Sequence, residues 1–287
     1  MRKVLLASPR GFCAGVERAL KTVDDALKTG PFPVYVLHEI VHNENVVESL
    51  RRRGVIFIDD PEEAAGGGTL IFSAHGVSRE VEEKAARLKV RVIDAACPIV
   101  KSLQRRIEAF EADGCEIILF GKKGHREVEG LLGRVHSTVH VVDSEEALEA
   151  FLAAADPAKH YACLSQTTLN ADDVARMGRR LQEKLPHLTF AAEVCFATRD
   201  RQRAVKELAG QCDVILVVGS EKSSNTRRLC ETAAACGVRS CRLSGAEDFE
   251  PSMIAGAKRV GITSGASAPE ELVRKLLETV EHCPCPD

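Results

Sequence analysis

Short apolar runs alternate with longer amphipathic stretches along the whole chain. Runs such as Val34–Leu37 and Ile117–Phe120 contain no polar residue apart from a tyrosine, which is typical of strands that are buried on both faces of a parallel sheet. Between such runs, Val81, Ala85 and Leu88 recur at helical spacing with charged residues between them. This alternation predicts an α/β protein whose sheets are mostly parallel and are covered by helices.

The same series of elements occurs three times. Each copy begins with a strand, a turn that carries a cysteine, and a helix, and two further turns rich in polar residues follow later strands. The three cysteines are Cys13, Cys97 and Cys195. Because self-similarity at a fixed period outranks other sequence signals, we predict three pseudo-repeated α/β units around a shared centre. The predicted units span residues 1–96, 97–193 and 194–287.

The amino-acid composition limits the kinds of binding partner that this protein is expected to have. The chain has 287 residues, of which 45% are hydrophobic and 28% charged, and its net charge is -3. This balance favours neither nucleic acid nor a membrane surface as a partner, and no apolar run approaches the ~18 residues of a membrane-spanning helix. Arg10 ends the apolar run near the N-terminus too early for a signal peptide. We therefore expect a cytoplasmic protein that acts as a monomer.

Eleven cysteines are present, which is a high number for such a protein. A disulfide framework is not expected in a chain of this size with an alternating βα pattern and no secretory signal. Most of the other cysteines lie in predicted strands or helices, where a thiol packs as a small hydrophobe. This group comprises Cys115, Cys163, Cys212, Cys230, Cys236 and Cys241. The terminal pair Cys283 and Cys285 receives no role.

Cys13, Cys97 and Cys195 share one topological position, which packing alone does not explain. If the repeats surround a pseudo-threefold axis, the three thiolates converge on it, and they could hold zinc or an iron–sulfur cluster with one open iron. Zinc sites usually take at least two thiolates from one short loop, whereas here each thiolate comes from a different unit. We therefore favour a central 4Fe–4S cluster with three protein ligands, whose fourth iron is a Lewis acid open to substrate.

Polar turns in the repeats predict an anion site. His42, His75 and His125 each follow a strand and precede a helix, and helix N-termini present unpaired N–H groups and partial positive charge. The third repeat has hydroxyl and amide side chains at the corresponding turns: Ser223, Ser224, Asn225 and Ser267. Together these donors suit a phosphate or a diphosphate, although Ser223–Asn225 alone could be only a helix cap.

Glu127 and Thr167 are the candidates for proton chemistry. A carboxyl desolvated beside the site has a raised pKa and can donate a proton, but a glutamate in the first turn of a helix also suits the helix dipole. The latter role is assigned to Glu129. Thr167 could relay a proton or hold a substrate hydroxyl, or it could cap the helix before Asp172.

Several longer motifs carry a resemblance that runs along essentially the whole chain. They are Pro9–Val16, His38–Asn43, Phe72–Val77, Asp94–Pro98, Gly124–His125 with Glu127–Gly130, Gln166–Leu169, Ser223–Asn225 and Gly265–Pro269. In these stretches the chain resembles the 4-hydroxy-3-methylbut-2-enyl diphosphate reductases, the LytB/IspH family.

The resemblance implies three α/β units around a 4Fe–4S cluster. It also implies two-electron reductive removal of the allylic hydroxyl, which gives isopentenyl and dimethylallyl diphosphate at the end of the non-mevalonate isoprenoid pathway. By position, the cluster ligands would be Cys13, Cys97 and Cys195. The diphosphate would be held by His42, His75, Ser223, Ser224, Asn225 and Ser267, with His125 nearby. The residues acting on the hydroxyl and its protons would be Glu127, Thr167 and His125.

Four residues depart from the family pattern: Ala96, Arg126, Arg199 and Asp200. None of these is a predicted site residue, but Arg126 could change the charge of the site beside His125. No G-x-G-x-x-G follows a strand, so the expected electron donor is a ferredoxin- or flavodoxin-like protein rather than a nicotinamide. The alternatives are a cluster-dependent dehydratase of a phosphorylated substrate, which needs no reductant, and a non-enzymatic iron–sulfur redox sensor.

Overall fold

The computed structural model describes residues 2–283. Its strands are β1 (Lys3–Leu6), β2 (Val34–Leu37), β3 (Val55–Ile58), β4 (Thr69–Phe72), β5 (Arg91–Asp94), β6 (Glu116–Phe120), β7 (Val139–Val142), β8 (Tyr161–Ser165), β9 (Leu188–Phe190), β10 (Val214–Val218), β11 (Arg239–Leu243) and β12 (Arg259–Ser264). Its helices are α1 (Ala14–Thr29), α2 (Glu44–Arg52), α3 (Arg79–Ala86), α4 (Pro98–Ala112), α5 (Arg126–Leu132), α6 (Glu145–Ala154), α7 (Ala171–Lys184), α8 (Phe196–Ala209), α9 (Ser224–Ala235) and α10 (Glu270–Glu281). Short 3₁₀ helices are η1 (Pro61–Ala64), η2 (Ala246–Asp248) and η3 (Pro251–Ile254).

The strands form three four-stranded sheets with one common topology. Their orders are β3-β2-β4-β5, β7-β6-β8-β9 and β11-β10-β12-β1, and every strand pair in them is parallel. In each sheet the edge strand beside the third strand leads into the turn that carries a cysteine. The predicted α/β class with three small parallel sheets is confirmed.

The N-terminal strand belongs to a different sheet from the one that the predicted ranges gave it. Strand β1 was grouped with residues 1–96, but it pairs with β12 in the third sheet, with Lys3 opposite Arg259 and Leu6 opposite Ile262. It occupies there the place that β5 and β9 take in the other two sheets. Without it β12 would be an edge strand with unpaired backbone groups, so the N-terminal strand completes a sheet whose other strands lie at the end of the chain.

The chain folds into two compact units. The first contains Met1–Glu17, Val41–Ser49 and Phe196–Asp287, and the second contains Arg18–Ile40 and Leu50–Cys195. The first unit holds the sheet of β10 and β12, and the second holds the other two sheets.

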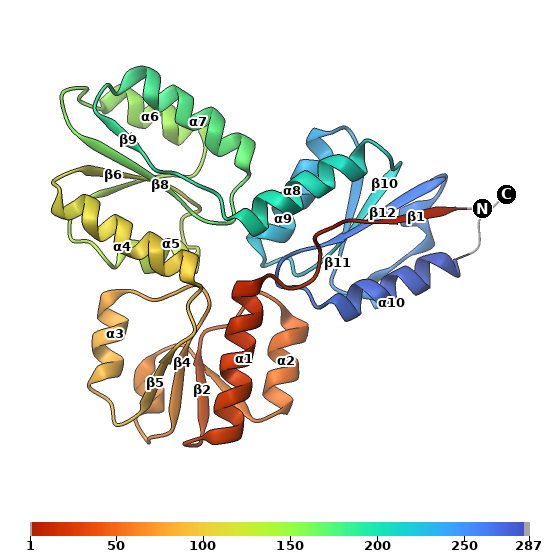
Figure 1. The fold of residues 1–287 in the computed structure, drawn as a ribbon, viewed down its shortest axis with the longest axis horizontal. Coiled ribbons are helices and arrows are strands. Elements are labelled where there is room, and N and C mark those ends of the chain that lie inside the picture. The colour runs from red at the N-terminus through yellow and green to blue at the C-terminus, as the bar shows by residue number, and fades with distance from the viewer. Residues whose placement is uncertain (1, 284–287) are drawn as a thin grey trace. The chain divides into compact units, whose positions relative to one another are not determined.

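In the first unit, helices cover both faces of the sheet. Strand β10 is buried along its whole length, and Figure 1 shows α10 on one side of this sheet and α8 and α9 on the other. Leu216 packs in one cluster with Leu276 of α10, whereas Ile215 packs in another with Val205 of α8 and Leu229 of α9. Alternate residues of a strand point to opposite faces, which explains why β10 is apolar at every position.

The second unit repeats this packing. Ile118 of β6 packs with Leu181 of α7, while its neighbour Ile117 packs with Leu131 of α5. In the other sheet of this unit, Leu70 of β4 packs with Ala85 of α3. Each sheet therefore has its own apolar core, and the polar turns are left at the carboxyl ends of the strands.

Polar contacts join the two sheets of the second unit. The backbone N–H of Arg79, which begins α3, donates to the carbonyl of Gly133 after α5 over 3.0 Å. The buried Gln104 of α4 donates from Nε2 to the carbonyl of Val77 over 3.0 Å. These contacts fix the segment after β4 against α4 and the end of α5.

Candidate functional site

The three predicted ligand cysteines occupy equivalent backbone positions. Strands β4, β8 and β12 are the third strands of their sheets, and each cysteine N–H donates to the carbonyl of the second residue after one of them. The pairs are Cys13 with Ala266 (3.1 Å), Cys97 with Ala74 (3.0 Å) and Cys195 with Thr167 (3.1 Å). Each thiol therefore lies at the carboxyl end of a sheet, where open α/β sheets bind ligands.

Their surroundings differ from those of the other cysteines. Cys13, Cys97 and Cys195 are partly exposed, whereas Cys163 in β8 is fully buried and burial raises the pKa of its thiol. Cys285 lies outside the described residues. Cys163 fits the predicted role of a small hydrophobe.

The three cysteines predicted as cluster ligands do not all belong to one compact unit. Cys13 belongs to the first unit, while Cys97 and Cys195 belong to the second. Between residues 2 and 283 no group of three or more histidine, cysteine, aspartate or glutamate side chains is arranged to hold a metal ion. Convergence of the three thiols stays a prediction.

Glu127 and Thr167 form a buried pair in the second unit. The backbone N–H of Thr167 donates to Oε1 of Glu127 over 2.7 Å, and its hydroxyl lies 2.8 Å from Oε2. Glu127 is 2% exposed and Thr167 8% exposed. The two residues follow the adjacent strands β6 and β8, whose parallel pairing brings their carboxyl ends to the same edge of the sheet.

Burial controls the ionisation of Glu127. Desolvation raises the pKa of its carboxyl from 4.5 to about 7, and the two hydrogen bonds from Thr167 oppose that shift only in part. Desolvation disfavours the charged form of a carboxyl, so Glu127 holds a proton at pH values where an exposed glutamate is ionised. This carboxyl can donate a proton near neutral pH.

One histidine contacts the backbone of Glu127, and a second lies beside the first. His125 is the N-cap of α5, and its Nδ1 accepts a hydrogen bond from the backbone N–H of Glu127 at 3.2 Å. An accepting Nδ1 leaves the proton of a neutral imidazole on Nε2. The ring of His75 lies edge-on to that of His125, with 6.0 Å between the centroids. The second unit therefore assembles four of the predicted residues: His75, His125, Glu127 and Thr167.

The first unit assembles the hydroxyl and amide donors at the N-terminus of α9. Ser223 caps this helix, with its Oγ accepting from the N–H of Thr226 at 3.3 Å. Ser224 and Asn225 stand in its first turn and are 4% and 3% exposed. Both amide atoms of Asn225 are buried without a hydrogen bond to any described residue. An unsatisfied buried amide is costly, and a ligand at the helix N-terminus would satisfy it.

His42 and Ser267 meet in the same unit. The hydroxyl of Ser267 donates to the backbone carbonyl of His42 over 3.0 Å. In the neighbouring loop, the hydroxyl of Ser220 donates to the carboxylate of Glu44 over 3.0 Å. These contacts tie the start of α2 to the loops after β10 and β12.

Arg126 leaves the charge of the buried carboxyl site little changed. Its guanidinium lies 3.2 Å from the carboxylate of Glu129 on the surface of α5, and the two side chains are 46% and 48% exposed. The arginine charge is thus directed to solvent and to a neighbouring carboxylate. Glu129 is exposed, in contrast to Glu127, and its carboxylate pairs with Arg126.

Sequence reasoning did not identify Gln166 as a structural contact of the site. It is fully buried, its Oε1 accepts from the N–H of Lys122 at 3.0 Å, and its Nε2 donates to the hydroxyl of Thr168 over 2.8 Å. It thereby connects the loop before His125 with the loop that holds Thr167. The sequence signals were its place directly after a buried strand and in the motif Gln166–Leu169.

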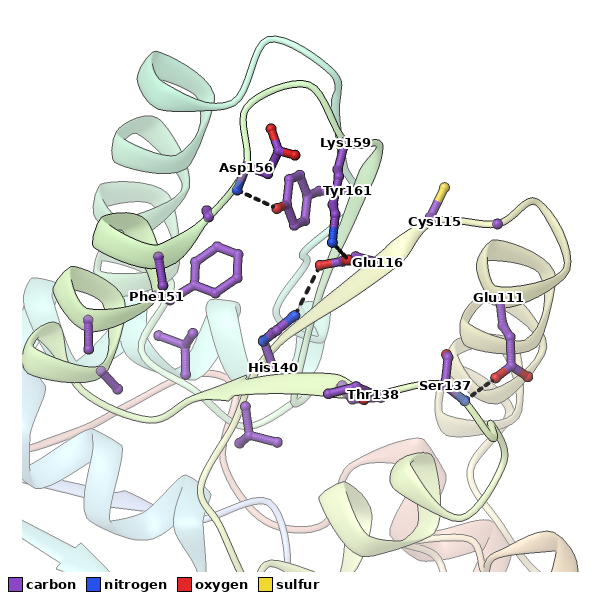
Figure 2. A pocket seen from close by; sticks show the side chains of 18 of the residues that line it. Glu111, Cys115, Glu116, Ser137, Thr138, His140, Phe151, Asp156, Lys159 and Tyr161 are labelled. Carbon is purple, nitrogen blue, oxygen red and sulfur yellow. Dashed lines mark hydrogen bonds and ion pairs between the residues drawn. The ribbon is translucent and has the colours of Figure 1, made fainter.

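A separate pocket lies at the other end of the same sheet (Figure 2). Its volume is about 950 Å³, and its walls include Glu116 and Tyr161, which begin β6 and β8, together with His140 of β7 and Phe151 of α6. Glu116 forms ion pairs with His140 and Lys159 there. None of the predicted site residues lines this pocket. The site residues lie at the carboxyl ends of the strands instead.

Among the described residues, no helix combines the length and the apolar character needed to cross a membrane.

Comparison with known proteins places the chain in a family. A family model described as "LytB protein" matches residues 4–281. A 4-hydroxy-3-methylbut-2-enyl diphosphate reductase from Saccharophagus degradans is 45% identical over 282 residues, which cover 96% of this chain and 90% of that protein. A second such reductase, from Burkholderia mallei, is 44% identical, with coverage of 96% and 84%.

Solved structures agree with the sequence comparison. The E-1-hydroxy-2-methyl-but-2-enyl-4-diphosphate reductase from Plasmodium falciparum is similar with a TM-score of 0.94 at 34% identity, covering 99% of this chain and 89% of that one. A structure described as (E)-4-hydroxy-3-methyl-but-2-enyl diphosphate reductase, the terminal enzyme of the non-mevalonate pathway, has a TM-score of 0.69 at 31% identity, with coverage of 99% and 100%. The chain belongs to the LytB protein family.

Proposed function

We propose that this chain is a 4-hydroxy-3-methylbut-2-enyl diphosphate reductase. The reaction takes up two electrons and two protons, breaks the allylic C–O bond, and releases water with isopentenyl or dimethylallyl diphosphate. Family membership supports the reaction class. The observation in the structure that carries the proposal is the buried Glu127–Thr167 pair, because loss of a hydroxyl as water requires a proton donor.

The diphosphate binds at the N-terminus of α9. Ser223, Ser224 and Asn225 offer hydroxyl and amide donors there, next to backbone N–H groups that carry partial positive charge. The unsatisfied amide of Asn225 supports a ligand at this position. Ser267 and His42 belong to the same unit and add donors, and His75 of the second unit completes the predicted set.

Glu127 supplies the proton. In its neutral form the carboxyl can donate from Oε2 to the hydroxyl of Thr167, 2.8 Å away, and that hydroxyl can in turn donate to the substrate oxygen, because a hydroxyl both accepts and donates. His125 orients the pair by accepting the N–H of Glu127 at its Nδ1.

Cys13, Cys97 and Cys195 hold the iron–sulfur cluster. All three are partly exposed cysteines in equivalent backbone positions, and thiolates are the usual ligands of such clusters. When bound, a 4Fe–4S cluster with three cysteine ligands supplies the electrons and an iron with an open position. A ferredoxin- or flavodoxin-like protein is the proposed electron donor, and a cytoplasmic monomer stays our prediction.

Anaerobic turnover tests this function. Protein carrying its cluster is mixed with a reduced viologen dye, and dye oxidation is followed as 4-hydroxy-3-methylbut-2-enyl diphosphate is added. Wild type should oxidise the dye, Cys97→Ser should lose activity together with iron, and Glu127→Gln should lose activity while it keeps iron. Glu129→Gln is the matched control, since Glu129 lies on the same helix but is exposed. A wild type that carries its cluster and consumes no reductant would contradict the proposal and favour the dehydratase or the sensor.

A further inference from the structure

Buried side chains hold the backbone of Gly11 on both sides. Its φ of 71° lies in the left-handed region, which glycine adopts readily. Its N–H donates to Oγ of Ser264 at the end of β12 over 2.8 Å, and its carbonyl accepts from Nη2 of Arg201 on α8 at 2.8 Å. Ser264 is 0% exposed and Arg201 3% exposed. The backbone two residues before Cys13 is therefore fixed by tertiary contacts.

Arg201 also binds the backbone beside a second predicted ligand. Its Nη1 donates to the carbonyl of Ala197 over 2.9 Å. Ala197 stands in the first turn of α8, two residues after Cys195. One guanidinium thus binds two backbone carbonyls. The first belongs to Gly11, two residues before Cys13, and the second to Ala197, two residues after Cys195.

Arginine has the geometry that this position requires. Its guanidinium is a planar fork whose nitrogens point in fixed directions, so one side chain can reach two carbonyls that belong to different segments. A lysine ammonium at the same place could bind one of them well. Because burying a charge is costly without hydrogen bonds, the two carbonyls and the arginine stabilise one another.

The outer side of the same loop is closed by an exposed ion pair. Arg10 lies 2.9 Å from Glu270 at the start of α10, with side chains that are 28% and 33% exposed, and it also donates to the carbonyl of Ala7 over 3.0 Å. A Cβ on Gly11 would lie 3.3 Å from Oε2 of Glu270. The loop between β1 and Cys13 has little room to shift either way.

We propose that Arg201 is a positioning residue for the metal ligands. It holds the Cys13 loop against the first turn of α8, so that the Cys13 and Cys195 thiols start from fixed backbone positions, and Ser264 supports the opposite side of Gly11. This inference rests on the proposed function, because it assigns Arg201 to the cysteines that hold the cluster there.

Cluster release into a chelator tests this role without turnover. Arg201→Gln, Arg201→Lys and Ser264→Ala are loaded anaerobically, their iron and sulfide are counted, and the rate at which excess chelator removes the iron is measured. Loss of hydrogen bonds to a charged group should speed iron release by about tenfold or more in Arg201→Gln. The rates of iron release from Arg201→Lys and Ser264→Ala should lie between those of Arg201→Gln and wild type.

A spectroscopic measurement separates positioning from general destabilisation. At equal iron content, the electron paramagnetic resonance spectrum of the reduced cluster should shift in Arg201→Gln and return toward wild type in Arg201→Lys. Arg203→Gln is the matched control, because Arg203 lies on the same helix and is 68% exposed. Wild-type release rates and spectra in both Arg201 variants, or an equal change in Arg203→Gln, would overturn the proposal.

Three further outcomes separate the proposals. If Arg201→Gln does not fold, Ser264→Ala decides the question, and an unchanged release rate in that variant overturns the proposal. A wild type that loads iron but does not turn over contradicts only the proposed reaction. A wild type that binds no iron overturns the metal site and the role of Arg201 together.

Discussion

The ionisation of Glu127 leads to the most direct prediction. Its pKa of about 7 means that about half of the molecules carry the proton at pH 7, compared with about 0.3% for a glutamate at its ordinary pKa. The shift of about 2.5 units corresponds to about 3 kcal/mol. Because the folded state binds this proton more tightly than the unfolded state, the contribution to stability is fully present below about pH 4.5 and is lost as the pH rises through about 7.

Infrared spectroscopy can measure this proton. The carbonyl stretch of a neutral carboxyl is separate from that of a carboxylate, so subtracting the Glu127→Gln spectrum from that of wild type isolates one group. The difference band should lose half its intensity near pH 7. Free energies of unfolding for the two proteins, measured from about pH 4.5 to about pH 8, should diverge by about 3 kcal/mol, with wild type losing stability relative to Glu127→Gln as the pH rises.

The outcome that refutes this reasoning is equally specific. A difference band that disappears below about pH 5.5 would mean that the carboxyl is hydrated or paired rather than desolvated. Glu129→Gln serves as the control and should leave the band unchanged, since Glu129 is exposed. If the band titrates near pH 7 but Glu127→Gln retains turnover, the burial argument stands and the proton has another source.

Three other changes test separate parts of the site. Thr167→Val removes the hydroxyl but keeps the backbone hydrogen bond, so the infrared band should show a higher pKa for Glu127 and dye-linked turnover should fall by about tenfold or more; an unchanged pKa would contradict the pairing. Asn225→Ala should raise the KM for the diphosphate substrate by about tenfold through loss of hydrogen bonds to an anion, and an unchanged KM would remove Asn225 from the binding site. Gly11→Ala forces a left-handed residue against Glu270, so it should lower the free energy of unfolding by about 1–2 kcal/mol, and wild-type stability in urea would contradict the proposed constraint.

Local patterns were enough to predict the sheets. Strand β10 is apolar at every position because both of its faces are covered, and that pattern is visible within five residues. The polar turns could be located for the same reason, since each follows such a strand directly. The capping role of Ser223 is local too, because its partner is only three residues away.

The position of β1 could not be predicted in this way. Its four residues read as a strand, but nothing in them specifies whether β4 or β12 is the neighbour. The choice depends on which sheet lacks a fourth strand, and β5 already completes the sheet of β4. Strand partnership is a property of the whole fold.

The sequence by itself determined the three-fold series of strands, cysteine turns and helices, and with it the residue types available at each turn. Tertiary structure decided which of those residues act together. Glu127 acquires its raised pKa from burial, and the hydrogen bonds from Thr167, 40 positions away along the chain, oppose that shift in part. Gly11 meets Arg201 across 190 positions. Periodicity and capping depend on neighbouring residues, whereas desolvation and long-range hydrogen bonds depend on segments that only folding brings together.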